Sequence, residues 1–91
     1  GYYKAGAWGI RIENLEVVRP APPIDGGELE TLMFEALTLA PIDLALVEPA
    51  LMTSAEMAWL DAYHTRVRET ITPLVDATTA AWLKDATRAL G

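Results

Sequence analysis

The chain has 91 residues, of which 52% are hydrophobic and 22% are charged, with no cysteine and a formal net charge of −6. The acidic balance argues against binding of nucleic acid, which requires a surface of clustered lysine and arginine. The absence of cysteine excludes a disulfide framework and thiolate metal sites, and it fits a reducing compartment, so we expect a cytoplasmic protein.

Two further features of the composition concern the surroundings of the chain. No uncharged apolar stretch approaches the ~20 residues that a helix needs to cross a bilayer, so no membrane partner is expected. A domain of this size buries only roughly 60% of its unfolded surface. The high apolar share therefore indicates that part of the surface is covered by something outside the chain, and we expect a piece of a longer protein.

Residues 1–8 predict the first arm and turn of a β-hairpin. Tyr2 and Tyr3 favour strands, and Gly6 can adopt the positive φ that a turn requires. Trp8 would then open the return arm, and the aromatic side chains are expected to pack across the strands.

Residues 9–18, GIRIENLEVV, predict a strand with charges in its middle. The two isoleucines point to one face, and Arg11 and Glu13 point to the other. After Asn14 the apolar phase shifts, so we expect a bulge or bend near this residue. A carboxylate with a guanidinium two residues away can be a metal ligand and its hydrogen-bonding partner. It can equally be a solvated face, and the residues alone leave both open.

Residues 19–31, RPAPPIDGGELET, predict a surface loop or linker. Three prolines remove backbone donors, and two consecutive glycines add conformational freedom. The acidic residues Asp25, Glu28 and Glu30 are expected to be solvated, because their spacing matches no calcium-binding loop.

The remaining residues predict a strand and two helices. Residues 32–42 show little alternation in polarity, which favours a strand buried on both sides. A helix is expected over residues 53–72, with Thr53 and Glu56 as a capping box and a stop at Pro73. A second helix is expected from about residue 79 to 89, capped by Asp76 or Thr78, with Trp82, Leu83, Ala86 and Leu90 as its apolar stripe.

The single histidine lies in the apolar stripe of the first predicted helix. His64 has no Asp, Glu or Cys four residues away, so we expect a packed histidine with one hydrogen bond rather than a metal ligand or base. Asp61 is expected to pair only loosely with Arg68 or Thr65. The aromatic residues Trp59, Tyr63 and Trp82 are either the core of the two helices or a partner surface.

Several stretches together resemble the Xaa-Pro aminopeptidases, the aminopeptidase P branch of the pita-bread metallopeptidases. GYYKAGAWGIRIEN (residues 1–14) resembles their last metal-ligand hairpin. FEALTLAPID (34–43), TSAEMAWLDAYHTRVRETITPL (53–74) and AWLKDATRAL (81–90) resemble the small C-terminal segment of the long members.

The resemblance implies an α+β fold. A β-hairpin and an extra strand would come from the edge of a pita-bread catalytic domain, and a C-terminal helical hairpin would follow. The last metal-ligand hairpin of the catalytic domain would then occupy residues 1–18, a Pro/Gly-rich loop residues 19–31, and the small C-terminal segment residues 32–91.

The implied activity is removal of the N-terminal residue from peptides with proline at position two. In this family two divalent metal ions, usually manganese or zinc, are held by two Asp, one His and two Glu. Glu13 matches the last of these and would bridge both ions, whereas the other Glu would lie two positions before Gly1. Arg11 matches an arginine that orients the carboxylate ligands. Since one Glu cannot hold a metal, this chain alone is expected to bind none and to be inactive.

The resemblance also implies partners, namely the rest of the same catalytic domain, a peptide substrate with penultimate proline and a second copy in a homodimer. One alternative is a non-catalytic pita-bread binding protein or a dimerisation module, which a missing ligand upstream of Gly1 would favour. A free-standing interaction domain is the third possibility, but the excess of apolar residues argues against it.

Overall fold

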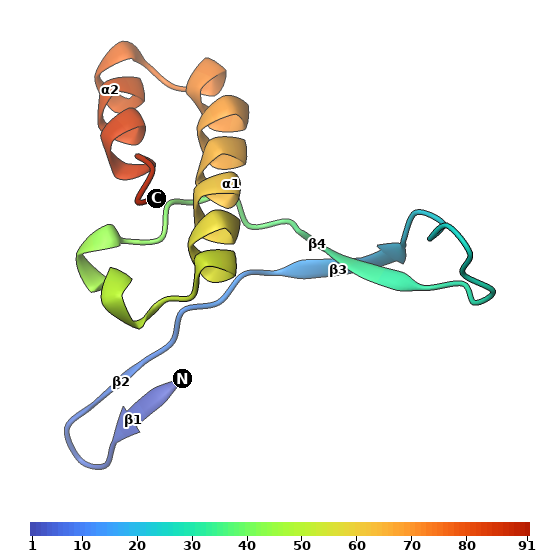
Figure 1. Cartoon of the computed structure of the whole chain (residues 1–91). Coiled ribbons are helices and arrows are strands. Elements are labelled where there is room, and N and C mark those ends of the chain that lie inside the picture. Colours follow the sequence, from blue (N-terminus) through green and yellow to red (C-terminus); the bar gives the residue numbers. More distant parts are fainter. The chain divides into compact units, whose positions relative to one another are not determined.

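The computed structural model describes residues 1–91, which divide into two units, Gly1–Thr38 and Leu39–Gly91. The first contains two antiparallel hairpins and the second is helical, so the fold is α+β, as predicted. No helix is long and apolar enough to span a membrane. Along the chain (Figure 1), the elements are β1 Tyr2–Lys4, β2 Trp8–Ile10, β3 Glu16–Pro20, β4 Leu32–Ala36, the 3₁₀ turns η1 Leu44–Leu46 and η2 Pro49–Leu51, α1 Ser54–Ile71, η3 Thr72–Leu74 and α2 Ala77–Ala86.

The first hairpin pairs β1 with β2, with Tyr2 opposite Ile10 and Lys4 opposite Trp8. Gly6 lies in the turn with φ +70°, a conformation that residues with a Cβ rarely adopt. The rings of Tyr2 and Trp8 pack across the strands with centroids 5.2 Å apart. The predicted hairpin and its cross-strand aromatic packing are thus both present.

The single strand predicted over residues 9–18 is wrong, because the chain changes partner within it. β2 ends at Ile10, β3 begins at Glu16, and residues 11–15 belong to no strand. β2 pairs with β1, whereas β3 pairs with β4. The shift of the apolar phase after Asn14, where a bulge or bend within one strand was expected, therefore marks a break between two hairpins.

The second hairpin pairs β3 with β4, from Glu16 opposite Ala36 to Pro20 opposite Leu32. Residues 21–31 join the two strands, and the Ala21 amide donates to the Thr31 carbonyl oxygen at 2.9 Å. The Pro/Gly-rich stretch is therefore a hairpin loop, and its first two residues, 19 and 20, belong to β3.

The strand predicted over residues 32–42 is shorter than expected and is not buried within this chain. β4 ends at Ala36, and Phe34 is 69% exposed. The reason is that β4 has a single neighbour, β3, so a ribbon of two strands leaves both of its faces uncovered. The continuous apolar pattern predicted burial of these side chains, but the two-stranded ribbon leaves Leu32, Met33 and Phe34 exposed in this chain.

Helix α1 begins where the capping box predicts. The hydroxyl of Thr53 accepts from the Glu56 amide at 3.1 Å, and the Glu56 carboxylate accepts from the Thr53 amide at 2.8 Å. These reciprocal bonds satisfy two of the amides that a helix start leaves without partners. The helix ends at Ile71, and Pro73 follows within η3.

Helix α2 begins two residues earlier than expected because Asp76 provides the cap. Its carboxylate accepts from the Thr79 amide at 2.7 Å, which also lowers the pKa of Asp76. Leu83 and Thr87, four residues apart, form the buried line of this segment, whereas Trp82 is 61% exposed. Adjacent helical residues point about 100° apart, so of the two places expected for Trp82, the core or a partner surface, the structure excludes the core of this chain.

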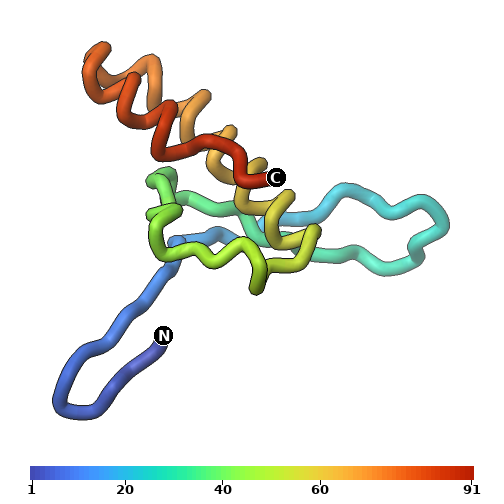
Figure 2. The backbone as a smooth tube through the Cα atoms, turned by 60° about the vertical axis from the view of Figure 1, so that its left-hand side comes forward, coloured from blue at the N-terminus to red at the C-terminus, as the bar shows by residue number.

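The core of the second unit is small and is built from residues of α1 and of the α2 segment, and the two helices run side by side in Figures 1 and 2. Arg68 of α1 donates to the Thr87 carbonyl oxygen at 2.7 Å and to its hydroxyl at 3.0 Å. The fully or nearly fully buried residues are Leu60, Tyr63, His64, Val67, Leu83 and Thr87.

The carboxylate of Asp61 holds the end of the chain against α1 and does not pair with Arg68 or Thr65 as was expected, although the Thr65 hydroxyl donates to the Asp61 backbone carbonyl oxygen at 2.9 Å. Its two carboxylate oxygens accept from the amides of Leu90 at 2.8 Å and Gly91 at 3.0 Å. These two hydrogen bonds lower the pKa of Asp61, because they favour the charged carboxylate. The prediction failed because the partners are backbone groups about thirty positions away, which side-chain spacing does not reveal.

Replacement of Asp61 by asparagine is expected to speed amide exchange at Leu90 and along α2, because an amide has one acceptor oxygen and no charge. In the wild type, the stabilisation that the Asp61 carboxylate provides is present above the ordinary pKa of 3.8. It is lost as the pH falls through the lower pKa that Asp61 has in the folded protein. Hydrogen–deuterium exchange measures both effects, and Asp85→Asn on the exposed side of α2 is the control. Equal exchange in the two variants would contradict this role.

Candidate functional site

The charged pair identified in the sequence lies in the break between β2 and β3. The Arg11 Nε donates to Glu13 Oε1 at 2.6 Å, and its Nη2 forms an ion pair with the same oxygen. Both contacts use Oε1, and the two side chains are 62% and 57% exposed. Exposed ion pairs typically contribute only ~0–1 kcal/mol to stability, so the fold of this unit does not depend on the pair.

The backbone is fixed on both sides of the pair. Upstream, β2 ends at Ile10, and Gly1 lies close against this end. A Cβ atom added to Gly1 would lie only 2.9 Å from the Ile10 carbonyl oxygen and 3.0 Å from Arg11 Cγ. Downstream, the Leu15 amide donates to the Thr38 hydroxyl at 2.8 Å, and the Leu15 carbonyl accepts from the Leu37 amide at 2.7 Å. Residues 11–15 are therefore held at both ends even though they belong to no strand.

The pair contains one carboxylate and is not a complete metal site by itself. No group of three His, Cys, Asp or Glu side chains in the chain could hold a metal ion. Hard cations take about six oxygen ligands, several from carboxylates. Glu13 alone therefore falls short of such a ligand set, and the structure shows that Arg11 fixes the position of its Oε1.

The histidine is a core residue, as expected. His64 is fully buried, and its Nε2 accepts from the Ile42 amide at 2.9 Å. Burial lowers its pKa below the ordinary 6.5, because the charged form loses its hydration. The ring is thus packed within the second unit, with Nε2 bonded to the Ile42 amide.

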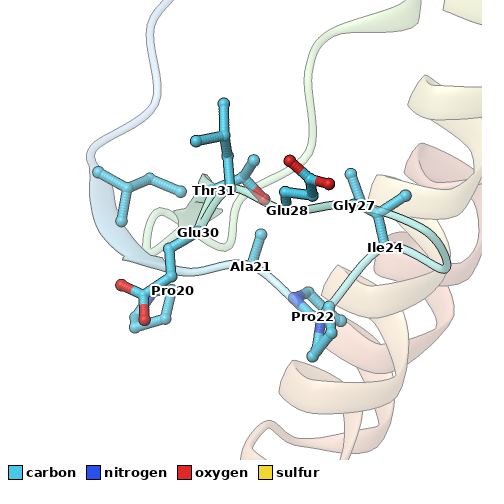
Figure 3. Close-up of a pocket in the computed structure, with 11 residues that line it drawn as sticks. Pro20, Ala21, Pro22, Ile24, Gly27, Glu28, Glu30 and Thr31 are labelled. Atoms are coloured by element: carbon cyan, nitrogen blue, oxygen red, sulfur yellow. The ribbon is translucent and has the colours of Figure 1, made fainter.

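The acidic loop residues do not form a site either. The loop between β3 and β4 borders an open cavity of about 500 Å³, lined on one side by Pro20, Ala21 and Pro22 and on the other by Glu28, Glu30 and Thr31 (Figure 3). Asp25 does not line this cavity. In Figure 3 the carboxylates of Glu28 and Glu30 point in different directions.

Sequence reasoning missed an apolar groove in the second unit. Trp59 borders it, is 53% exposed, and stacks on the buried Tyr63 with ring centroids 5.4 Å apart. The turns η1 and η2 lie within the segment that lines the groove. In the sequence they could have been predicted from their N-cap residues, Asp43 and Glu48. The carboxylate of Asp43 accepts from the Ala45 amide at 3.0 Å. The groove has a volume of about 520 Å³ and is lined by Ile42, Val47, Met52, Ala55, Glu56, Trp59 and Leu60.

Comparison with known proteins gives the family. The family model described as the C-terminal region of peptidase_M24 matches residues 30–90. Aminopeptidase P2 of Arabidopsis thaliana is 45% identical over 92 residues, which cover 99% of this chain and 13% of that protein. Aminopeptidase P1 of Lotus japonicus is 41% identical over 93 residues, which cover 100% of this chain and 14% of that protein.

A solved structure agrees with this assignment over both units. The X-prolyl aminopeptidase of Caenorhabditis elegans, described as a cytosolic enzyme with a di-nuclear active site, is 30% identical, with a TM-score of 0.82. The match covers 98% of this chain and 15% of the other. The present chain thus spans about one seventh of the relatives that it matches. It belongs to the aminopeptidase P branch of the M24 peptidases, which have the pita-bread fold, and its residues 30–90 correspond to their C-terminal region.

Proposed function

We propose that the chain is the C-terminal part of a metal-dependent Xaa-Pro aminopeptidase, which removes the N-terminal residue from peptides with proline at position two. The observation that carries the proposal is the Arg11–Glu13 pair, anchored between Ile10 and Leu15. It lies within the GIRIEN stretch that resembles the last metal-ligand hairpin of this family. Membership of the aminopeptidase P branch supports the same activity.

In this proposal Glu13 would be one of the carboxylate ligands that hold two divalent ions, manganese or zinc. Bound at this position, the metal would supply Lewis-acid polarisation of the scissile carbonyl and activation of a water molecule. The chain's own residues fix the ligand, since Arg11 holds Oε1 and offsets the carboxylate charge. The remaining ligands come from the rest of the same catalytic domain, so the 91-residue chain alone binds no metal and is inactive.

Replacement of Arg11 by lysine in the full-length protein is expected to lower activity about 10- to 100-fold, the range typical of groups that orient metal ligands. A lysine keeps the charge but loses the planar guanidinium that contacts Glu13 with two nitrogens. Peptidase assays at saturating metal measure the effect. Arg19→Lys is the matched control, because Arg19 also pairs with a carboxylate, that of Glu35. Equal activities of the two variants would remove the proposed role of Arg11.

The substrate class is tested by comparing two peptides that differ only at the second position. The full-length protein is expected to release the first residue from an Xaa-Pro peptide and to leave the matching Xaa-Ala peptide uncut. Cleavage of both at similar rates would contradict the proposed specificity.

The C. elegans enzyme is described as cytosolic, and we propose the same compartment here, with no nucleic acid or membrane partner.

A second candidate function is a binding or dimerisation module, and one observation favours it. The exposed Trp59, next to an apolar groove, and the exposed Trp82 leave large aromatic surface uncovered in the second unit. We propose that the full-length protein forms a homodimer, and sedimentation at micromolar concentration tests this. A folded full-length dimer without peptidase activity under any metal would favour the non-catalytic pita-bread alternative.

A further inference from the structure

The segment just before η1 is held by side chains instead of a neighbouring strand. The Tyr63 hydroxyl donates to the Ala40 carbonyl oxygen at 3.0 Å and accepts from the Ala40 amide at 3.4 Å. Two positions further along, the Ile42 amide donates to His64 Nε2 at 2.9 Å. Consecutive residues of α1 thus provide backbone partners that would otherwise come from a β-ladder.

The hydrogen bond of His64 requires the neutral ring. Because Nε2 is the acceptor, the neutral ring carries its proton on Nδ1, and this atom is buried without a hydrogen-bond partner. Protonation of Nε2 would place an N–H group against the Ile42 N–H group. It would also put a charge at a fully buried position where no oxygen accepts from the ring.

The charged groups around His64 only partly offset this cost. Burial is the main cause of its lowered pKa, Arg68 on the same helix lowers it further, and Asp61 raises it. The only charged residue of the segment Leu39–Asp43 is Asp43, whose carboxylate is bonded to the Ala45 amide. On the side of α2, the buried residues Leu83 and Thr87 are uncharged.

We propose that Tyr63 and His64 form a pH-sensitive attachment of residues 39–42 to α1, closed while His64 is neutral and released when the ring is protonated. The released state gains a proton that the closed state excludes, so acid favours release. In the released state His64 titrates near the ordinary histidine pKa of 6.5, whereas in the closed state the pKa of His64 is lower. The attachment is therefore fully stable above pH 6.5 and weakens by up to about tenfold per pH unit below it, down to the lower pKa.

The test is hydrogen–deuterium exchange of the amides at residues 40–42 in the full-length protein, at pH 7.5 and 5.5, corrected for the intrinsic pH dependence of exchange. Wild type is expected to lose up to about tenfold of its protection at the lower pH. His64→Gln keeps an oxygen that can accept from Ile42 but cannot titrate, so its protection should change less than twofold. Tyr63→Phe removes the Ala40 bonds and leaves His64 intact, so it should lower protection at both pH values and keep the pH response.

Each outcome bears on the proposal. Wild-type protection that is equal at both pH values would overturn it, whatever the variants do. A pH response that persists in His64→Gln would overturn it as well, because the titrating group would then be another one. If glutamine disturbs the fold, His64→Leu serves instead, since it removes both acceptor and titration and should show low protection without a pH response.

Discussion

Replacing Glu13 by glutamine in the full-length protein is expected to lower kcat on an Xaa-Pro peptide by more than ~100-fold, beyond the range typical of groups that only orient metal ligands. Glutamine keeps the shape of the side chain but loses the negative charge with which a carboxylate binds a divalent ion. The same variant should bind less metal, measured by elemental analysis after dialysis. Stability should hardly change, because the Arg11–Glu13 pair is exposed and such pairs contribute little.

Glu16→Gln is the matched control for this prediction. Glu16 opens β3, is also exposed, and lies three positions from Glu13. It should retain wild-type activity and metal content. Near-normal turnover of the Glu13 variant, with unchanged metal content, would remove Glu13 from the metal site.

The largest expected effect on stability comes from Leu83→Ala. Leu83 is 2% exposed and contributes α2's main apolar side chain to the small core of the second unit. Deleting such a side chain typically costs about 2–5 kcal/mol, because it removes buried apolar area and leaves a cavity. A loss of about 2 kcal/mol corresponds to roughly 30-fold faster exchange of the α1 and α2 amides, since 1.4 kcal/mol is a factor of ten.

Leu51→Ala provides the comparison, because Leu51 is 84% exposed. Its effect should stay within about 0.5 kcal/mol, as is usual for surface positions. Native-state hydrogen exchange of the full-length protein measures both variants in the same amides. An effect of Leu83→Ala no larger than that of Leu51→Ala would mean that α2 does not depend on this core.

The features that sequence reasoning predicts well are local. The capping box of Thr53 and Glu56 lies within four residues, and so does the cap that Asp76 provides to α2. The burial of His64 follows from its place in a helical stripe of apolar residues. The contact of Arg11 with Glu13 is similarly local, because strand-like alternation places residues two apart on one face.

The features that it misses depend on partners far away in the sequence. The break between β2 and β3 arises because the two strands pair with different neighbours, which the residues of 9–18 do not specify. The hydrogen bonds from the Leu90 and Gly91 amides to Asp61, and those between the Tyr63 hydroxyl and the Ala40 backbone, join side chains to distant backbone. Backbone groups are present at every residue, so no residue type signals such contacts. The proposed role of Glu13 goes further still, because it depends on ligands that are not in this chain.

The most direct test of the proposed function is the activity of the full-length protein on an Xaa-Pro peptide after removal of metal and again after addition of Mn²⁺ or Zn²⁺. We expect no cleavage by the metal-free protein, recovery of cleavage when the metal is restored, and no recovery in Glu13→Gln. A folded protein that stays inactive with either metal, or one that cleaves equally well without metal, would contradict a metal-dependent peptidase in which Glu13 is a ligand.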